Sequence, residues 1–144
     1  CIRDRFKRCE EHEGITYHGY QPHDVVEEAL KKAHIFAYPS VWLETSCISA
    51  IEAASAMCTV VHPNYGALPE TMSNFGVGYQ YSEKDNEHGN IFGGALMATI
   101  ENYLDEKNHK RLQLGLKSQK AYFDTYYNWD IRADQWTDFL KGLE

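Results

Sequence analysis

Two carboxylates bracket a run of small and apolar residues in the sequence ETSCISAIEA, where Glu44 comes first and Glu52 follows eight positions later. If a helix begins between them, its first backbone NH groups and its dipole form an anion site suited to a phosphate. A carboxylate about two turns into that helix can accept two hydrogen bonds from a vicinal diol such as a ribose. An ordinary helix with a charged start and a charged face has the same spacing, so the pattern alone leaves both interpretations open.

Two other segments combine a glycine with groups that could contact a ligand. In HPNYGALPET, Gly66 permits a left-handed turn or a close backbone approach, and Glu70 lies in the first turn of a predicted helix. In HGYQ, Gly19 ends a predicted strand where a flat base could lie against the backbone, and Tyr20 could stack on it or fill a gap. Each segment also fits a plain loop.

The elements that would position these residues alternate between strand and helix. Short β-branched or apolar runs predict strands, and amphipathic or helix-compatible stretches predict helices. The strands are expected at 15–19, 35–38, 58–63 and 76–81, and the helices at 2–12, 25–33, 46–57, 89–105, 107–123 and 130–143, with a further helix start at 68–71. Asp24 is the expected N-cap of the second helix, and Thr45 or Ser46 that of the third. The alternation predicts an α/β fold, with a Rossmann-like parallel sheet and helices on both faces. Ligands of such sheets bind beyond the carboxyl ends of the strands.

The bulk composition narrows the class of protein. With 144 residues, 43% hydrophobic and 13% aromatic, the chain is globular and long enough for one domain with a core. A net charge of -7 argues against nucleic-acid binding. The four cysteines form no CxxC pair and the histidines are scattered, so we expect reduced thiols and no metal site. No apolar run is long enough to span a membrane.

The order of the motifs is more specific than any one of them. TYHGY, AHIFAYPS, the Glu44 to Glu52-Ala53 pair, TVVHP, YGALPE and FGVGY follow one another over residues 15–105. This series resembles the C-terminal, nucleotide-sugar-binding domain of retaining glycosyltransferases of the GT-B fold, family 4. The resemblance implies a transferase whose substrate is a nucleotide-diphosphate-sugar, working without metal or cofactor.

The resemblance also implies a role for each matching residue. Glu44 is the catalytic carboxylate beside the donor sugar, and Glu52 binds the ribose. The remaining donor-binding positions are the backbone of Ser46, Cys47 and Ile48 at the diphosphate, Gly66 and Glu70 near the sugar or the domain cleft, and Gly19, Tyr20 and Gln21 near the base.

Three departures from the family pattern bear on these expectations. Ser46-Cys47 replaces a common Phe-Gly, and Met57 stands where the turn before the next strand usually has Gly. Nothing before residue 14 matches the family's Gly-Arg loop or the Lys that follows it, which together neutralise the diphosphate. We therefore expect 1–144 to be one partial donor-binding domain that lacks its first strand or strands and its N-terminal acceptor domain. Such a fragment would be inactive alone and would bind donor weakly.

Two alternatives stay open beside the transferase. The chain could be a noncatalytic nucleotide-binding or interaction module of the same fold, or part of a sugar-nucleotide epimerase. We expect a cytoplasmic protein, with membrane association of the full-length protein left open. An apolar face left uncovered by missing strands would favour self-association of the fragment.

Overall fold

The computed structural model describes residues 2–143, with side chains from residue 4 onward, and has a parallel sheet at its centre. The strands are β1 (Ile35–Ala37), β2 (Thr59–Pro63) and β3 (Val77–Tyr79), in the order β1-β2-β3. Both pairs are parallel, with Ile35 opposite Thr59 and Val61 opposite Val77. Every residue of β2 is buried, which explains why its sequence TVVHP shows no alternation of apolar and polar residues.

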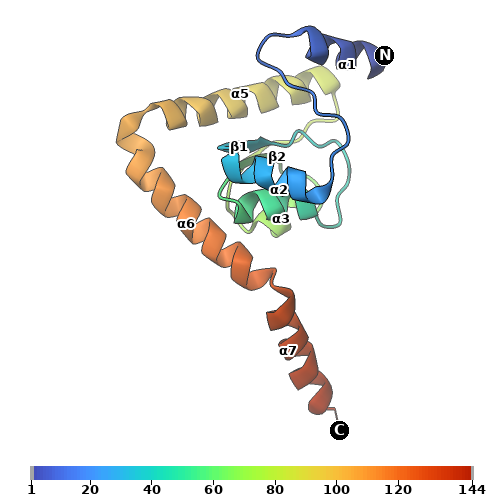
Figure 1. Cartoon of the computed structure of the whole chain (residues 1–144), viewed down its shortest axis with the longest axis vertical. Coiled ribbons are helices and arrows are strands. Elements are labelled where there is room, and N and C mark those ends of the chain that lie inside the picture. Colours follow the sequence, from blue (N-terminus) through green and yellow to red (C-terminus); the bar gives the residue numbers. More distant parts are fainter. Residues whose placement is uncertain (1, 144) are drawn as a thin grey trace.

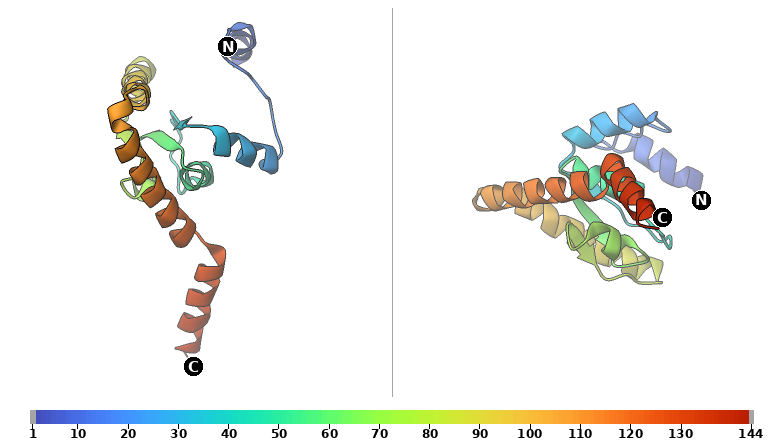
Figure 2. Two further views of the ribbon diagram at one scale, coloured as in Figure 1. Left: turned by 60° about the vertical axis from the view of Figure 1, so that its left-hand side comes forward. Right: turned by 90° about the horizontal axis from the view of Figure 1, so that it is seen from below.

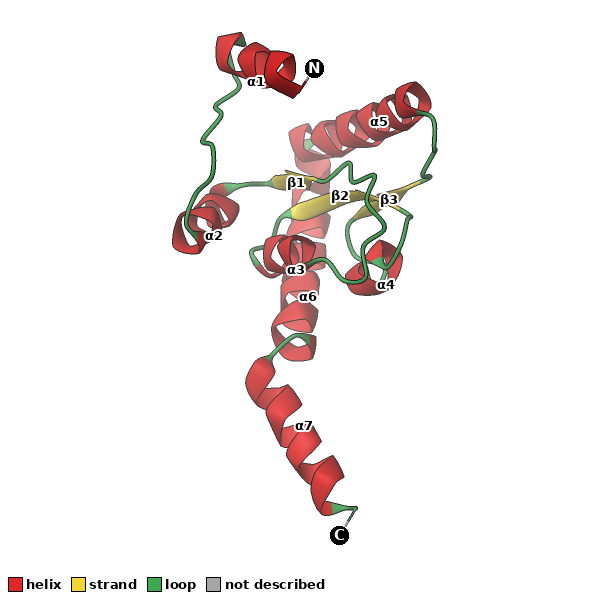
Figure 3. Cartoon of the chain, turned by 90° about the vertical axis from the view of Figure 1, so that its right-hand side faces the viewer, coloured by secondary structure: helices red, strands yellow, loops and turns green. Residues whose placement is uncertain are grey.

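Helices cover both faces of this sheet, as the sequence predicts. The helices are α1 (Ile2–Glu11), α2 (His23–Lys32), α3 (Ile48–Ser55), α4 (Leu68–Met72), α5 (Asp85–Leu104), the short 3-10 turn η1 (Glu106–Asn108), α6 (His109–Tyr126) and α7 (Trp129–Lys141). Figures 1 and 3 show α5 on one face and α3 on the other, with α4 beside α3 in Figure 3. From the end of α5, α6 passes the sheet to pack on α3, and α7 continues away from it.

The core forms where α3 meets β2 and α6. The α3 face toward them consists of alanines, and Ala50, Ala53 and Ala54 are fully buried. Small side chains let the three elements approach closely, and the buried ring of Phe123 on α6 fills the space beside them. Gln119 of α6 donates hydrogen bonds from Nε2 to the carbonyls at the end of α3 and the start of the next segment, which anchors α6 to α3.

The strand predicted at 15–19 is wrong. This segment is exposed and has no ladder hydrogen bonds among the described residues. Figure 2 shows it as an extended connection that leads to α1, away from the sheet. In a doubly wound sheet of order 3-2-1-4-5-6, two strands lie between the third strand and the fourth. If 15–19 were the third strand and β1 the fourth, those two strands would be needed to connect them. Here β1 is an edge strand, so 15–19 has no neighbour to pair with, and a strand without a neighbour is not stable.

Two predicted helix caps are also wrong. Helix α2 begins at His23, after Pro22, so Asp24 lies inside its first turn. Helix α3 begins at Ile48, with Cys47 in an extended conformation as its N-cap, instead of Thr45 or Ser46. Cys47 is buried in the core, and the helix begins at the residue after it. Neither Pro22 nor Cys47 makes a side-chain capping bond.

The turn between α3 and β2 forms even though it lacks the family's glycine. Met57 takes the left-handed conformation, with φ of 69°, that glycine adopts without steric cost. The NH groups of Met57 and Cys58 bond to the carbonyls of Ala54 and Ala53, at 3.2 and 2.9 Å. The departure in sequence therefore leaves the turn geometry in place, with a non-glycine residue in the left-handed region.

Candidate functional site

Two loops that follow adjacent strands meet at the carboxyl edge of the sheet. The loop after β1 carries Glu44, and the loop after β2 carries Gly66. The NH of Ala67 donates to the Glu44 carbonyl at 2.9 Å. Gly66 has φ of +57°, and a Cβ at this position would lie only 2.8 Å from the Glu44 carbonyl oxygen and 2.9 Å from its nitrogen. The fold thus brings together two residues that the sequence places in one site, and the contact requires glycine.

The Glu44 side chain is held by Tyr38, a residue that sequence reasoning missed. The Tyr38 hydroxyl donates to Oε1 of Glu44 at 2.6 Å, in a partly buried position. Burial raises the pKa of Tyr38 well above its ordinary value, and the adjacent Glu44 and Cys47 act in the same direction. The phenol therefore remains a hydrogen-bond donor. The one indication in the sequence was a tyrosine, with its polar hydroxyl, directly after an apolar strand.

The start of α3 leaves three backbone NH groups without a helical acceptor, two positions later than predicted; Ile48 and Ser49 are exposed there, whereas Ala50 is buried. The first helical bond runs from the NH of Ile51 to the carbonyl of Cys47, so the NH groups without a helical acceptor are those of Ile48, Ser49 and Ala50. The predicted stretch was 46–48, and only Ile48 is shared. The two other residues of the predicted stretch differ in solvent exposure: Ser46 is exposed, whereas Cys47 is buried.

Glu52 lies one turn into α3 and faces α2. Four residues after the helix begins, its carboxylate is about 6 Å along the axis from the first amides. Its side chain is 30% exposed, and Oε1 lies 3.7 Å from Nε2 of His23 at the start of α2. His23 is equally far from Oε1 of Glu27, so it stands between two carboxylates. Sequence reasoning missed His23, because its pairing depends on how α2 and α3 pack.

Glu52 also lines a hollow of about 590 Å³ between α2, α3 and α6. Lysines and acids both line this hollow, but Lys120 is paired with Asp124 at 2.8 Å and Lys31 with Glu28 at 2.8 Å. Among the side chains that the structure describes, no lysine or arginine forms an ion pair with Glu44 or Glu52. Of the described side chains, His23 is the one within ion-pair distance of Glu52, although Lys31 and Lys120 line the same hollow.

The other predicted site residues are not brought into contact with Glu44. Tyr20 is fully exposed, and Gly19 has open space around its Cα. Gln21 donates a hydrogen bond to the carbonyl of His18, and its segment leads directly into α2. Glu70 is exposed in the first turn of α4. The roles predicted for these residues at the base and the sugar remain predictions.

An aromatic cluster adjoins Gly66, and its rings come from the loops after β2 and β3, from the end of β3 and from α5. Tyr65 stacks on Tyr81, with ring centroids 3.9 Å apart. The hydroxyl of Tyr79, whose pKa burial raises to about 12, lies 3.2 Å from Nε2 of His88. Nδ1 of His88 is buried without a hydrogen-bond partner in the described structure. Sequence reasoning did not single out this cluster, because its rings come from separate segments.

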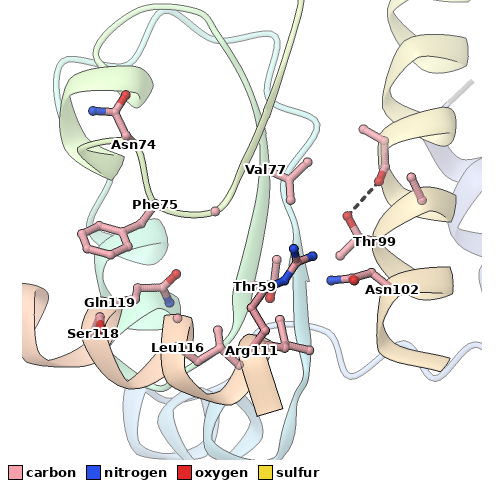
Figure 4. A pocket seen from close by; sticks show the side chains of 15 residues that line it. Thr59, Asn74, Phe75, Val77, Thr99, Asn102, Arg111, Leu116, Ser118 and Gln119 are labelled. Atoms are coloured by element: carbon pink, nitrogen blue, oxygen red, sulfur yellow. Dashed lines mark hydrogen bonds between the residues drawn. The ribbon is translucent and has the colours of Figure 1, made fainter. Parts of the chain in front are cut away.

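A separate pocket of about 470 Å³ lies at the other edge of the sheet, between α5 and α6 (Figure 4). Thr59 and Val77, which begin β2 and β3, line it together with Asn102 and Arg111. None of the predicted site residues contributes to it. The structure therefore separates this pocket from the carboxyl edge, where Glu44 and Glu52 lie.

The described part of the chain holds no group of three or more His, Cys, Asp or Glu side chains placed to hold a metal ion. Nor does any helix within these residues have the length and apolar character needed to cross a membrane.

Comparison with protein families identifies the class of protein to which this chain belongs. Residues 1–110 match the model of the family described as glycosyl transferases group 1. The match covers more than half of the chain, so the chain belongs to this family, and its parallel α/β architecture is that of a Rossmann-like glycosyltransferase C-terminal domain. No curated protein and no solved structure matches the chain in the corresponding searches.

Proposed function

We propose that the chain is the donor-binding part of a retaining, family 4-like hexosyltransferase of the GT-B fold, which transfers a sugar from a nucleotide-diphosphate-sugar to an acceptor. The observation that carries the proposal is the start of α3. Along the chain, its amides at Ile48, Ser49 and Ala50, which lack a helical acceptor, come between Glu44 and Glu52, and the helix follows a loop at the carboxyl edge of the sheet. Membership of the glycosyl transferase family supports the reaction class.

In this proposal each part of the edge contacts one part of the donor. The amides of α3 and its dipole bind the diphosphate and stabilise charge on the leaving group. Glu52 accepts hydrogen bonds from the ribose diol, about 6 Å further along the helix. Glu44 accepts hydrogen bonds from the sugar and favours positive charge near its anomeric carbon. Gly66 keeps the neighbouring loop tight against Glu44.

The proposal assigns the remaining functions to residues outside positions 1–144. Basic side chains that neutralise the diphosphate, and the N-terminal domain that binds the acceptor, would come from the longer enzyme. The pairing of the nearby lysines supports this division, because Lys31 and Lys120 line the hollow beside Glu52 but are each paired with another carboxylate. The 144-residue chain is then inactive alone and binds donor weakly. Transfer proceeds without a metal ion.

The test compares two carboxylates that share one histidine. In the full-length enzyme, Glu52→Ala should raise the donor KM at least tenfold, because the ribose loses its carboxylate acceptor. Glu27→Ala is the matched control, since Glu27 lies the same 3.7 Å from His23 but sits on α2. A donor KM that stays unchanged in Glu52→Ala, or that rises equally in both variants, would refute the assignment.

A further inference from the structure

Hydrogen bonds hold the backbone of Glu44 on two sides, independently of its side chain. Its NH donates to the carbonyl of Trp42 at 3.0 Å, and its carbonyl accepts from the NH of Ala67 at 2.9 Å. Gly66 lies against the same peptide. These contacts place the Cα of Glu44 but leave the torsions of a flexible side chain undetermined. A carboxylate that must meet a sugar in one geometry needs a further constraint.

Tyr38 supplies a constraint of this kind. Its NH donates to the carbonyl of Val61 at 2.9 Å, so it continues the pairing of β1 with β2. Its ring stacks on Phe36 at 5.5 Å with 15° between the planes, and both rings pack against the core. The hydroxyl is therefore carried by a rigid element and not by the loop that it contacts.

The contact makes the two carboxylate oxygens of Glu44 unequal. Oε1 accepts from Tyr38 at 2.6 Å, whereas Oε2 has no hydrogen bond among the described residues. A hydrogen bond to an ionised carboxylate is short and about twice as strong as one between neutral groups. The Tyr38 phenol cannot easily lose its proton, because burial raises its pKa. One oxygen is thus occupied and the other remains for a ligand.

We infer that Tyr38 is a positioning residue of the donor site, which fixes one oxygen of Glu44 so that the other can meet the donor sugar. This inference rests on the proposed function of Glu44. It predicts that the hydroxyl of Tyr38 matters for the reaction only while the Glu44 carboxylate is present. A purely structural hydroxyl would matter equally with or without that carboxylate.

A double-mutant cycle in the full-length enzyme separates these cases. Tyr38→Phe removes only the hydroxyl and should lower kcat by roughly 10- to 100-fold, the range for losing a hydrogen bond to a charged group, with less than about a threefold change in donor KM. In the Glu44→Ala background the same substitution should change kcat less than about twofold. An equal loss of kcat in both backgrounds would overturn the inference.

Tyr103→Phe is the matched control. Tyr103 is also partly buried, and its hydroxyl bonds to the carbonyl of His34 at 2.8 Å and lies 2.9 Å from Oγ1 of Thr59, at the amino ends of the strands. Tyr103→Phe should lower thermal stability by about as much as Tyr38→Phe does, but its kcat should stay within about twofold of the wild-type value. A comparable loss of kcat in Tyr103→Phe would show a general effect of stability and would overturn the inference.

Two outcomes separate the positioning role of Tyr38 from the proposed role of Glu44 in the donor site. If Glu44→Ala lowers kcat but Tyr38→Phe does not, the positioning role is wrong and the donor site stands. If Glu44→Ala leaves kcat unchanged, both fail together. Should Tyr38→Phe not fold, Glu44→Asp breaks the same contact from the other side by withdrawing the carboxylate. It should lower kcat similarly, and wild-type kcat in Glu44→Asp would overturn the positioning role.

Discussion

The contact between Gly66 and Glu44 allows a quantitative test of how the two loops are joined. In Gly66→Ala the new Cβ would lie 2.8 and 2.9 Å from backbone atoms of Glu44, well inside ordinary van der Waals separations of about 3.5–4 Å. The residue also has φ of +57°, where an L-residue is strained. The substitution therefore carries two costs, one conformational and one steric.

Their sum can be estimated from the separate terms. Left-handed strain costs about 1–2 kcal/mol, and the reduced entropy of the unfolded chain returns about 0.4–1 kcal/mol. Forcing an added methyl against fixed backbone costs a further 1–3 kcal/mol or so. We expect Gly66→Ala to lower the free energy of unfolding by about 2–3 kcal/mol, with Tm falling by roughly 3 °C per kcal/mol.

Urea denaturation of the 144-residue chain, followed by circular dichroism, measures this loss against a matched control. Gly19 has a similar φ of +63°, but a Cβ there would have open space around it. Gly19→Ala should therefore lose about 1 kcal/mol or less, because only the conformational term applies. Equal losses at the two glycines would refute the reasoning, since they would show that contact with Glu44 contributes nothing.

Two further predictions concern the elements that support the site. Burial lowers the pKa of His62 in β2 below its ordinary value of 6.5, so the unfolded chain takes up this proton first and stability falls as pH drops below about 6.5. Urea midpoints at pH 7.5 and 5 should differ less in His62→Gln than in the wild type, and an unchanged difference would contradict this. Phe123→Ala should lower the free energy of unfolding by about 3–5 kcal/mol, because this ring is 1% exposed between α6 and α3. Leu114→Ala, at a 58% exposed position on the same helix, should cost under about 1 kcal/mol, and similar losses would argue against α6 as a support of α3.

The sequence was sufficient for the layered α/β architecture, because buried parallel strands are continuous apolar runs and the helices between them are amphipathic. It failed at 15–19, where the β-branched and aromatic composition is right but no neighbouring strand is present to pair with. Strand formation depends on a partner, and composition alone does not report one.

The candidate site was predictable in its acidic residues and not in the contacts that hold them. Glu44 and Glu52 stand out by type and spacing. Helix α3 begins at Ile48, after the buried Cys47, and the burial of that side chain is a tertiary contact. The Tyr38 contact to Glu44 and the His23 contact to Glu52 depend on how neighbouring elements pack, so local sequence could not reveal them.

The most direct test of the proposed donor site is a titration of the full-length protein with UDP, GDP and ADP, observed by NMR after selective ¹⁵N labelling of isoleucine and alanine. Binding at the start of α3 predicts that at least one nucleotide displaces the amide signals of Ile48 and Ala50. Ala98, which lines the pocket at the opposite edge, should remain unmoved. Shifts at Ala98 with silent amides at Ile48 and Ala50 would contradict the account and would place the nucleotide between α5 and α6 instead.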